Sequence, residues 1–117
     1  MESYYEAYNS GDTQALGQFY AEDIVLVSAQ GEIKGRAALL ATYEWITGQM
    51  LDRMTPESIL IEGRRAAVEI NDVFTAKHDV PDFLGRSLRA GESFSIKLCG
   101  IYTLGDDGFD RITLYQR

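Results

Sequence analysis

The segment Ala66–Ala76, A-A-V-E-I-N-D-V-F-T-A, constrains the fold more than any other part of the chain. Successive side chains of a β-strand point to opposite faces of the sheet, so residues two apart share a face. One face of this segment is apolar except for Asp72, and a carboxylate there is costly unless it is paired, hydrogen-bonded or protonated. We therefore expect a sheet that curves around a cavity in which Asp72 meets a partner or a ligand. The residues on this face are Val68, Ile70, Asp72, Phe74 and Ala76.

The second half of the chain is typical of an antiparallel sheet, because alternating segments are separated by glycine-containing turns. Lys77–Gly91 contains Pro81 and has no clear period, so we expect a long, mobile loop without a regular ladder over one rim. The predicted strands are Ile59–Glu62, with Pro56 near its edge, then Ala66–Ala76, Ser93–Leu104 and Asp110–Gln116, with turns at 63–64 and 105–108.

The first half of the chain is predicted to be mainly helical. Gly11 suits the left-handed position after a helix, and Asp12 suits the N-cap of the next one. Helices followed by antiparallel strands indicate an α+β fold, here in one domain, residues 1–117. The expected helices are Glu2–Asn9, Thr13–Tyr20 and Arg36–Thr47, the last ending near Gly48, and the expected strands between them are Ile24–Ala29 and Glu32–Lys34.

Composition excludes several classes of function. The 117 residues carry a net charge of −7, so a nucleic-acid backbone would be repelled. The single cysteine, Cys99, rules out an intramolecular disulfide and a cysteine zinc cluster, and we expect it to be a buried structural thiol. No leader peptide opens the chain and no apolar run has the length of a membrane span, so a soluble, cytoplasmic protein that binds no membrane is expected.

Short motifs along almost the whole chain carry a family resemblance. In their order and spacing they resemble the nuclear transport factor 2-like superfamily and its SnoaL-like domains. The resemblance implies a cone, in which a strongly bent antiparallel sheet wraps around helices and leaves an apolar pocket at its open end. Homodimers packed through the convex face of the sheet are common in that family. The motifs are Tyr4–Asp12, Phe19–Leu26, Lys34–Arg36, Asp82–Gly85, Ala90–Ser93, Gly100–Leu104 and Arg111–Thr113.

The resemblance to ketosteroid isomerase tests one reaction. That enzyme uses an aspartate base with an oxyanion hole made of a tyrosine and a protonated aspartate. The resemblance puts its tyrosine at Tyr4, its base at Ser28 and its second aspartate at Gly100. A serine hydroxyl at its ordinary pKa does not abstract such a proton and glycine offers no donor, so we do not expect that mechanism here. Polyketide cyclases of the SnoaL type also use an acidic residue at the position of Gly100.

Limonene-epoxide hydrolase is similar in the strand motif Glu69–Phe74 and in the glycine at Gly100. The resemblance implies that Asp72 matches one of its two catalytic aspartates. The arginine that bridges them falls on Ile70, however, and the second aspartate falls near Arg117. Because epoxide opening needs a base and an acid together, only part of that machinery is retained.

Two interpretations of Asp72 remain open. It faces an apolar pocket with a raised pKa and acts as a general acid or base, or it forms a structural ion pair with Arg117 or a nearby cation. No cofactor is expected, and a metal site is poorly supplied because the only histidine, His78, lies in the rim loop. The residues expected to contact a small, apolar or partly polar ligand are Tyr4, Tyr8, Ser28, Tyr43, Trp45, Phe74, Phe83 and Tyr102.

Two functions from different classes follow. The first is a small-molecule-binding domain that keeps the pocket without catalysis. The alternative is an enzyme, similar to the isomerases, cyclases or epoxide hydrolases of the family, that uses Asp72 as its acid or base. A homodimer is also expected, because Val73, Cys99 and Ile101 make the outward face of the sheet half apolar.

Overall fold

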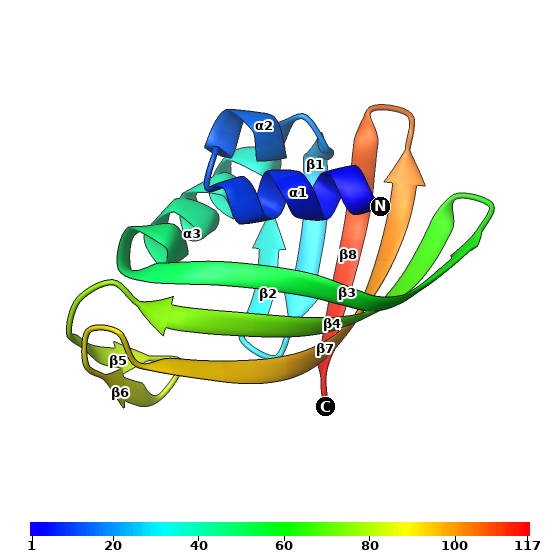
Figure 1. The fold of residues 1–117 in the computed structure, drawn as a ribbon. Coiled ribbons are helices and arrows are strands. Elements are labelled where there is room, and N and C mark those ends of the chain that lie inside the picture. The colour runs from blue at the N-terminus through cyan, green and yellow to red at the C-terminus, as the bar shows by residue number, and fades with distance from the viewer.

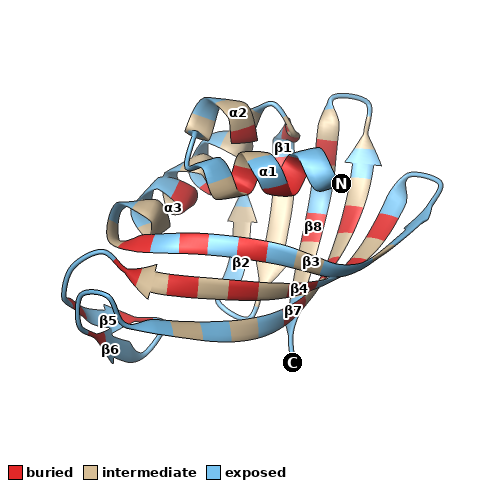
Figure 2. Cartoon of the chain, viewed as in Figure 1, coloured by how far each residue is buried: buried red, intermediate tan, exposed pale blue.

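The alternating segment forms β4 (Arg65–Ala76) in the computed structural model, which describes residues 1–117. Every second residue of β4 from Ala66 to Ala76 is buried, and Asp72 is among them. This is the face that the sequence pattern predicted. Figure 2 shows the resulting alternation of buried and less buried residues along β4 and its neighbour β3 (Met50–Glu62).

β4 is part of a curved six-stranded sheet whose strand order is β2-β1-β8-β7-β4-β3. Neighbouring strands are antiparallel except β1 and β8, which run parallel. The sheet is not closed, so β2 and β3 are its edges (Figure 1). This confirms the predicted α+β class. The remaining strands of the sheet are β1 (Tyr20–Ser28), β2 (Gly31–Lys34), β7 (Ser93–Gly105) and β8 (Gly108–Gln116).

The three helices, α1 (Glu2–Ser10), α2 (Thr13–Gly17) and α3 (Arg36–Gln49), lie together on the concave side of the sheet (Figure 1). As predicted, Gly11 ends α1 in a left-handed conformation, with φ 76°, and the side chain of Asp12 caps α2.

The second helix is shorter than predicted. It ends at Gly17, and Tyr20 already belongs to β1. The backbone carbonyl of Phe19 accepts a hydrogen bond from the backbone N–H of Phe109, at 2.8 Å. Because this bond pairs Phe19 with the start of β8, the last residues of the predicted helix, up to Tyr20, join the sheet instead of continuing α2.

The strand predicted at Ile59–Glu62 is only the end of β3, which begins at Met50, directly after α3. In its first half Met50, Asp52 and Met54 are buried on the concave face. The register against β4 shifts between Pro56 and Ser58. A proline is tolerated there because β3 is an edge strand, whose outer N–H groups need no ladder partner.

The segment Lys77–Gly91 is not the irregular loop that its sequence predicted. It contains a small hairpin of β5 (Val80–Phe83) and β6 (Arg86–Leu88). Leu84 and Gly85 form its turn with φ values of 52° and 78°. The prediction was wrong because tertiary packing decides here: the side chains of Val80, Phe83 and Leu88 are buried in a second hydrophobic cluster with Met50, Phe74 and Ala76.

The main hydrophobic core lies between the helices and the concave face, where α1 contributes Tyr4, Tyr5 and Tyr8. Cys99 is half-buried rather than fully buried, because it lies on the opposite, convex face of β7. None of the helices combines the length and the apolar character that crossing a membrane requires.

Candidate functional site

A cavity of about 370 Å³ lies between the helices and the concave face of the sheet. Of the 25 residues that line it, 19 are hydrophobic. Asp72, the predicted catalytic residue, is on its wall, and the structure brings all the predicted ligand-contacting residues to the same cavity. These are Tyr4, Tyr8, Ser28, Tyr43, Trp45, Phe74, Phe83 and Tyr102.

A second aspartate, Asp52 of β3, joins Asp72 on this wall. In the β3–β4 register, Asp52 is opposite Phe74 and Met54 is opposite Asp72, so the two aspartates are diagonal neighbours on one face. Asp52 is 8% exposed and Asp72 is 1% exposed. The sheet register therefore creates a buried pair of carboxyl groups within an otherwise apolar face.

Helix α1 fixes one member of this pair. The Tyr8 hydroxyl donates a hydrogen bond of 2.6 Å to Asp52 Oδ2. Tyr8 is itself positioned, because Tyr43 donates to its backbone carbonyl. Next to it, Asn9 Nδ2 donates to the Met54 carbonyl and the Met54 N–H donates to Asn9 Oδ1, each at 2.8 Å. These two hydrogen bonds attach α1 to β3 beside Asp52.

Both carboxyl groups have a pKa raised above the ordinary range of an aspartate. Burial, followed by the hydrogen bond and the charge of Asp52, raises the pKa of Asp72 to about 10. Burial also raises the pKa of Asp52, but hydrogen bonds from Asp72 and Tyr8 oppose that rise. Asp72 is therefore protonated at neutral pH, the hydrogen bonds to Asp52 favour its ionised form, and the two groups titrate as a unit.

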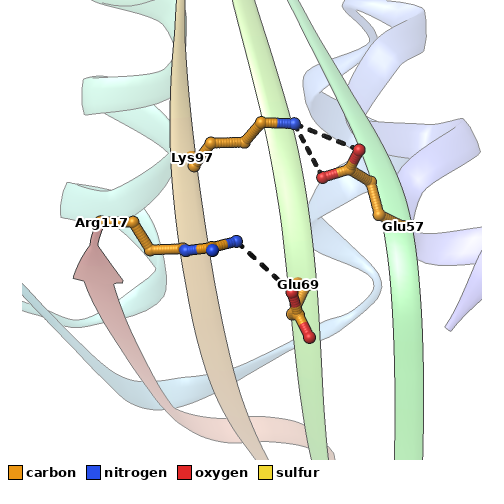
Figure 3. A network of polar contacts seen from close by, with 4 residues as sticks. All are labelled: Glu57, Glu69, Lys97 and Arg117. Atoms are coloured by element: carbon orange, nitrogen blue, oxygen red, sulfur yellow. Dashed lines mark hydrogen bonds and ion pairs between the residues drawn. The ribbon is translucent and has the colours of Figure 1, made fainter.

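No cation balances the pair. Arg117 pairs with Glu69 on the convex face, with 3.5 Å between Nη1 and Oε2 (Figure 3), so the alternative in which it neutralises Asp72 does not hold. No lysine, arginine or histidine lines the cavity. Asp52 Oδ1 and Asp72 Oδ1 are buried and receive no hydrogen bond from any N–H or hydroxyl group of the protein. Each of these two oxygens can therefore accept a hydrogen bond from a molecule in the cavity.

Burial raises the pKa of both Tyr4 and Tyr102 far above the ordinary range, so both stay neutral. The hydroxyls of Tyr4 and Tyr20 are 2.8 Å apart, and the Tyr5 hydroxyl donates to Tyr102 at 2.9 Å. A Cβ on Gly100 would lie 2.7 Å from Cε2 of the Tyr102 ring. The glycine at position 100 thus makes room for the Tyr102 ring.

Aromatic and apolar residues surround the mouth of the cavity. The rings of Trp45 and Phe83 are stacked with centroids 5.7 Å apart, and Trp45 is 55% exposed. Ser28, on the wall formed by β1, is engaged locally with Gln30 through its hydroxyl. His78 lies outside the cavity and is exposed, as the prediction of a rim position required.

Asp52 is the functional candidate that sequence reasoning missed. The alternation Met50, Asp52, Met54 could have identified it, but the strand after this helix was predicted to begin only at Ile59, whereas β3 begins at Met50. No group of three or more histidine, cysteine, aspartate or glutamate side chains in the structure could hold a metal ion.

Comparisons with solved structures match almost the whole chain. An LEH-like epoxide hydrolase of M. tuberculosis has a TM-score of 0.79 and 14% identity, over 99% of this chain and 78% of that one. A hypothetical protein from Catenulispora acidiphila with a ketosteroid isomerase-like fold, in complex with trimethylamine, has a TM-score of 0.77 and 14% identity, over 97% and 82%. An NTF2-like protein of unknown function from Cytophaga hutchinsonii has a TM-score of 0.73 and 14% identity, over 99% and 85%.

These likenesses establish the fold alone. None of the curated proteins compared with the chain matches it in sequence. The SnoaL-like domain family, in contrast, matches residues 1–115, nearly the whole chain. The chain therefore belongs to the SnoaL-like domain family, and its curved sheet with helices on the concave face gives it a fold similar to that of the NTF2-like protein.

Proposed function

We propose that this domain binds a small, largely apolar organic molecule in the cavity, with one polar group of that molecule at Asp52 and Asp72. The observation that carries the proposal is a pair of buried carboxyl groups without a cation on the wall of an apolar cavity. Burying such groups is costly, and a packed apolar face would be more stable. A ligand that uses the two groups accounts for their presence.

The dimensions of the cavity fit this proposal. Its volume, about 370 Å³, is within the range of roughly 300–1,000 Å³ that is usual for small-molecule sites. Ring-stacked aromatics at the mouth and a few polar groups at one wall are typical of sites in which the apolar body supplies affinity and the polar group supplies orientation.

Binding can be tested with a neutral apolar dye, N-phenyl-1-naphthylamine, excited beyond the absorption of tryptophan. We expect saturable binding to the wild type and a loss of at least about tenfold in affinity for Ile96→Trp, whose new ring fills the cavity. Ser95→Trp is the matched control, because Ser95 is its neighbour in β7 and is not part of the cavity wall. Equal loss in both variants, or no binding to the wild type, contradicts the proposal.

Acid–base catalysis is the second candidate. It is favoured by one observation: Asp72, with its raised pKa, lies beside Asp52, whose ionised form the hydrogen bond from Tyr8 favours, so the two can serve as an acid and a base at one place. The fold is shared with an LEH-like epoxide hydrolase, although Ile70 and Arg117 are not the residues that such a hydrolase mechanism uses. Exchange of the α-hydrogens of cyclohexanone in D₂O, followed by NMR, tests this function. Wild-type exchange above that of both Asp52→Asn and Asp72→Asn supports it, and equal rates exclude this reaction.

For the assembly of the domain, we propose a homodimer packed through the convex face. Val73, Cys99 and Ile101 lie there half-buried, and Leu51 and Tyr115 are exposed on the same side of the sheet. Sedimentation of the wild type at micromolar concentration should give a dimer, and Ile101→Glu should give a monomer with unchanged secondary structure. A wild-type monomer contradicts this proposal and leaves the ligand proposal untouched.

A further inference from the structure

We infer that the ligand of the cavity carries a basic nitrogen and is bound as a primary ammonium ion between Asp52 and Asp72. This inference rests on the proposed function and adds the chemical class of the ligand. Three features of the cavity support it independently: the sign of its charged groups, the number of hydrogen-bond acceptors without a donor, and the aromatic rings around them.

Every titratable group that faces the carboxyl pair is an acid or a phenol. Helices α1 and α3 and strands β1 and β7 present tyrosines, whereas β2, β8 and the β5–β6 hairpin present only uncharged residues. A carboxylate or phosphate ligand would therefore meet negative charge in a poorly solvated site, where repulsion is strong. An ammonium ion would supply the missing positive charge. The titratable residues, besides the aspartates, are Tyr4, Tyr8, Tyr20, Tyr43 and Tyr102.

The count of acceptors favours nitrogen over a hydroxyl group. Asp52 Oδ2 already accepts from Tyr8, but Asp52 Oδ1 and Asp72 Oδ1 have no protein donor. A ligand hydroxyl has one hydrogen to donate and can serve only one of them, whereas a primary ammonium group has three. Because it is charged, the ammonium group also makes the stronger hydrogen bonds to carboxylates.

The aromatic rings add an attraction that only a cation exploits. Tyr8 and Tyr43 line the cavity near Asp52, with ring centroids 5.0 Å apart, and Tyr4 and Tyr102 also line it, with ring centroids 5.6 Å apart. Aromatic faces attract ammonium ions, most strongly where water is excluded. The same rings accept apolar groups, so they suit an amine on a hydrocarbon body.

The proton balance makes this inference measurable. Without a ligand Asp72 holds a proton at neutral pH; when an ammonium ion binds between two ionised carboxylates, that proton leaves to solvent. One proton is then released for each ammonium ion bound. By linkage, the affinity for the ammonium form rises with pH, by up to about tenfold per pH unit between pH 6 and pH 9, below the pKa of an ordinary alkylamine near 10.4.

Three probes with one cyclohexane ring and different head groups provide the test: cyclohexylmethylamine, cyclohexylmethanol and cyclohexanecarboxylate. Titration calorimetry at pH 8 in phosphate and in Tris gives both the affinity and the number of protons released. We expect the amine to bind at least about tenfold more tightly than the alcohol, with close to one proton released, and the carboxylate not to bind.

Asp72→Asn separates the charge from the proton. The variant keeps one carboxylate, Asp52, so the amine should still bind, but without proton release and without a pH-dependent affinity. Glu69→Gln, on the opposite face of β4, is the matched control and should behave as the wild type. Thermal melts establish that each variant is folded, and the wild-type titrations decide the inference even where a variant is not.

The outcomes distinguish this inference from the proposed function. If the alcohol binds as tightly as the amine, or if the amine binds without releasing a proton from the wild type, the amine inference is overturned while the ligand-binding proposal stands. If the carboxylate binds best, the inference is overturned in the same way. If the wild type binds none of the three probes and also fails to bind the neutral dye, both are overturned.

Discussion

The acidic residues on the two faces of β3, β4 and β7 have opposite surroundings: those on the convex face pair with cations, and those on the concave face do not. On the convex face, Glu57 pairs with Lys97, whose Nζ is 2.9 Å from Oε1, and Glu69 pairs with Arg117 (Figure 3). On the concave face, Asp52 and Asp72 have each other and no cation. Asp72 and Glu69 belong to the same strand, and only the direction of their side chains separates them.

This contrast shows that surroundings rather than residue type determine what a carboxyl group does. The convex pairs are about half exposed, so water screens them and each is worth between zero and about 1 kcal/mol. The concave pair is buried away from solvent, so ionising both groups is costly and a proton is retained. The concave face can therefore exchange a proton with a ligand, while the convex face offers fixed charges.

The largest effect expected from this contrast is on the pH dependence of stability. The pKa of Asp72 is about 10 in the folded state and near 3.8 in the unfolded chain. Between these values the folded state holds a proton that the unfolded state has lost. The contribution of Asp72 to the free energy of unfolding should therefore be complete below about pH 4. It should fall as the pH rises toward 10, by at most about 1.4 kcal/mol per pH unit.

Asp72→Asn should remove that slope, because an amide does not titrate and can still donate a hydrogen bond to Asp52. We expect the variant to match the wild type near pH 5 and to be more stable at pH 8, by about 1–3 kcal/mol. Urea denaturation at each pH measures this. Glu69→Gln, the control, should keep the wild-type slope; a parallel loss of stability in Asp72→Asn at every pH would mean that the pair is not protonated.

An effect of similar size at a single pH should come from the hydroxyl of Tyr8. Tyr8→Phe removes the donor to Asp52 Oδ2, and a hydrogen bond to a charged group is worth about 1.5–3 kcal/mol. Tyr5→Phe is the matched control on the same helix, because it removes a bond between two neutral hydroxyls, worth about 0.5–1.5 kcal/mol. Chemical denaturation at pH 7 compares them. Equal losses would indicate that Asp52 is not the ionised member of the pair.

The sequence was sufficient to find Asp72 but not its partner. Asp72 interrupts the apolar face of a long, regular strand with a period of two residues. The sequence of that strand alone therefore identifies it as unusual. Asp52 lies three residues after the end of α3, but the next strand was predicted to begin only at Ile59, and the neighbouring Arg53 makes the segment look polar. Whether the two aspartates meet depends on the register of β3 against β4, which no local pattern specifies.

The aromatic residues that line the cavity were predicted better than the β5–β6 hairpin, which carries one of them. Tyr4 and Tyr8 are four residues apart in one predicted helix, and Tyr43 belongs to the apolar face of another, so each helix was expected to turn its tyrosines toward the core. The β5–β6 hairpin that carries Phe83 was missed, because Pro81 and Asp82 argue against a strand and only the burial of its apolar side chains on Phe74 stabilises it. Propensity fails where a short element depends on tertiary contacts.

The smallest effect belongs to the convex face. The side chains of Glu57 and Lys97 are each 46% exposed. Glu57→Gln keeps the size of the side chain and removes the charge, so the free energy of unfolding at pH 7 should change by less than about 0.5 kcal/mol, and by less still in 0.5 M salt, where the Debye length is only about 4 Å.

A double-mutant cycle with Lys97→Met isolates the pair from the other effects of each substitution. A coupling energy of about 0.2–1 kcal/mol that falls with added salt fits an exposed pair. A coupling above about 2 kcal/mol that salt does not reduce would mean that the convex face is desolvated as well. In a dimer packed through that face, the coupling should therefore be larger at concentrations at which the protein associates than at concentrations at which it is monomeric. The cycle then reports whether both faces of the sheet are dry, which would remove the contrast between them.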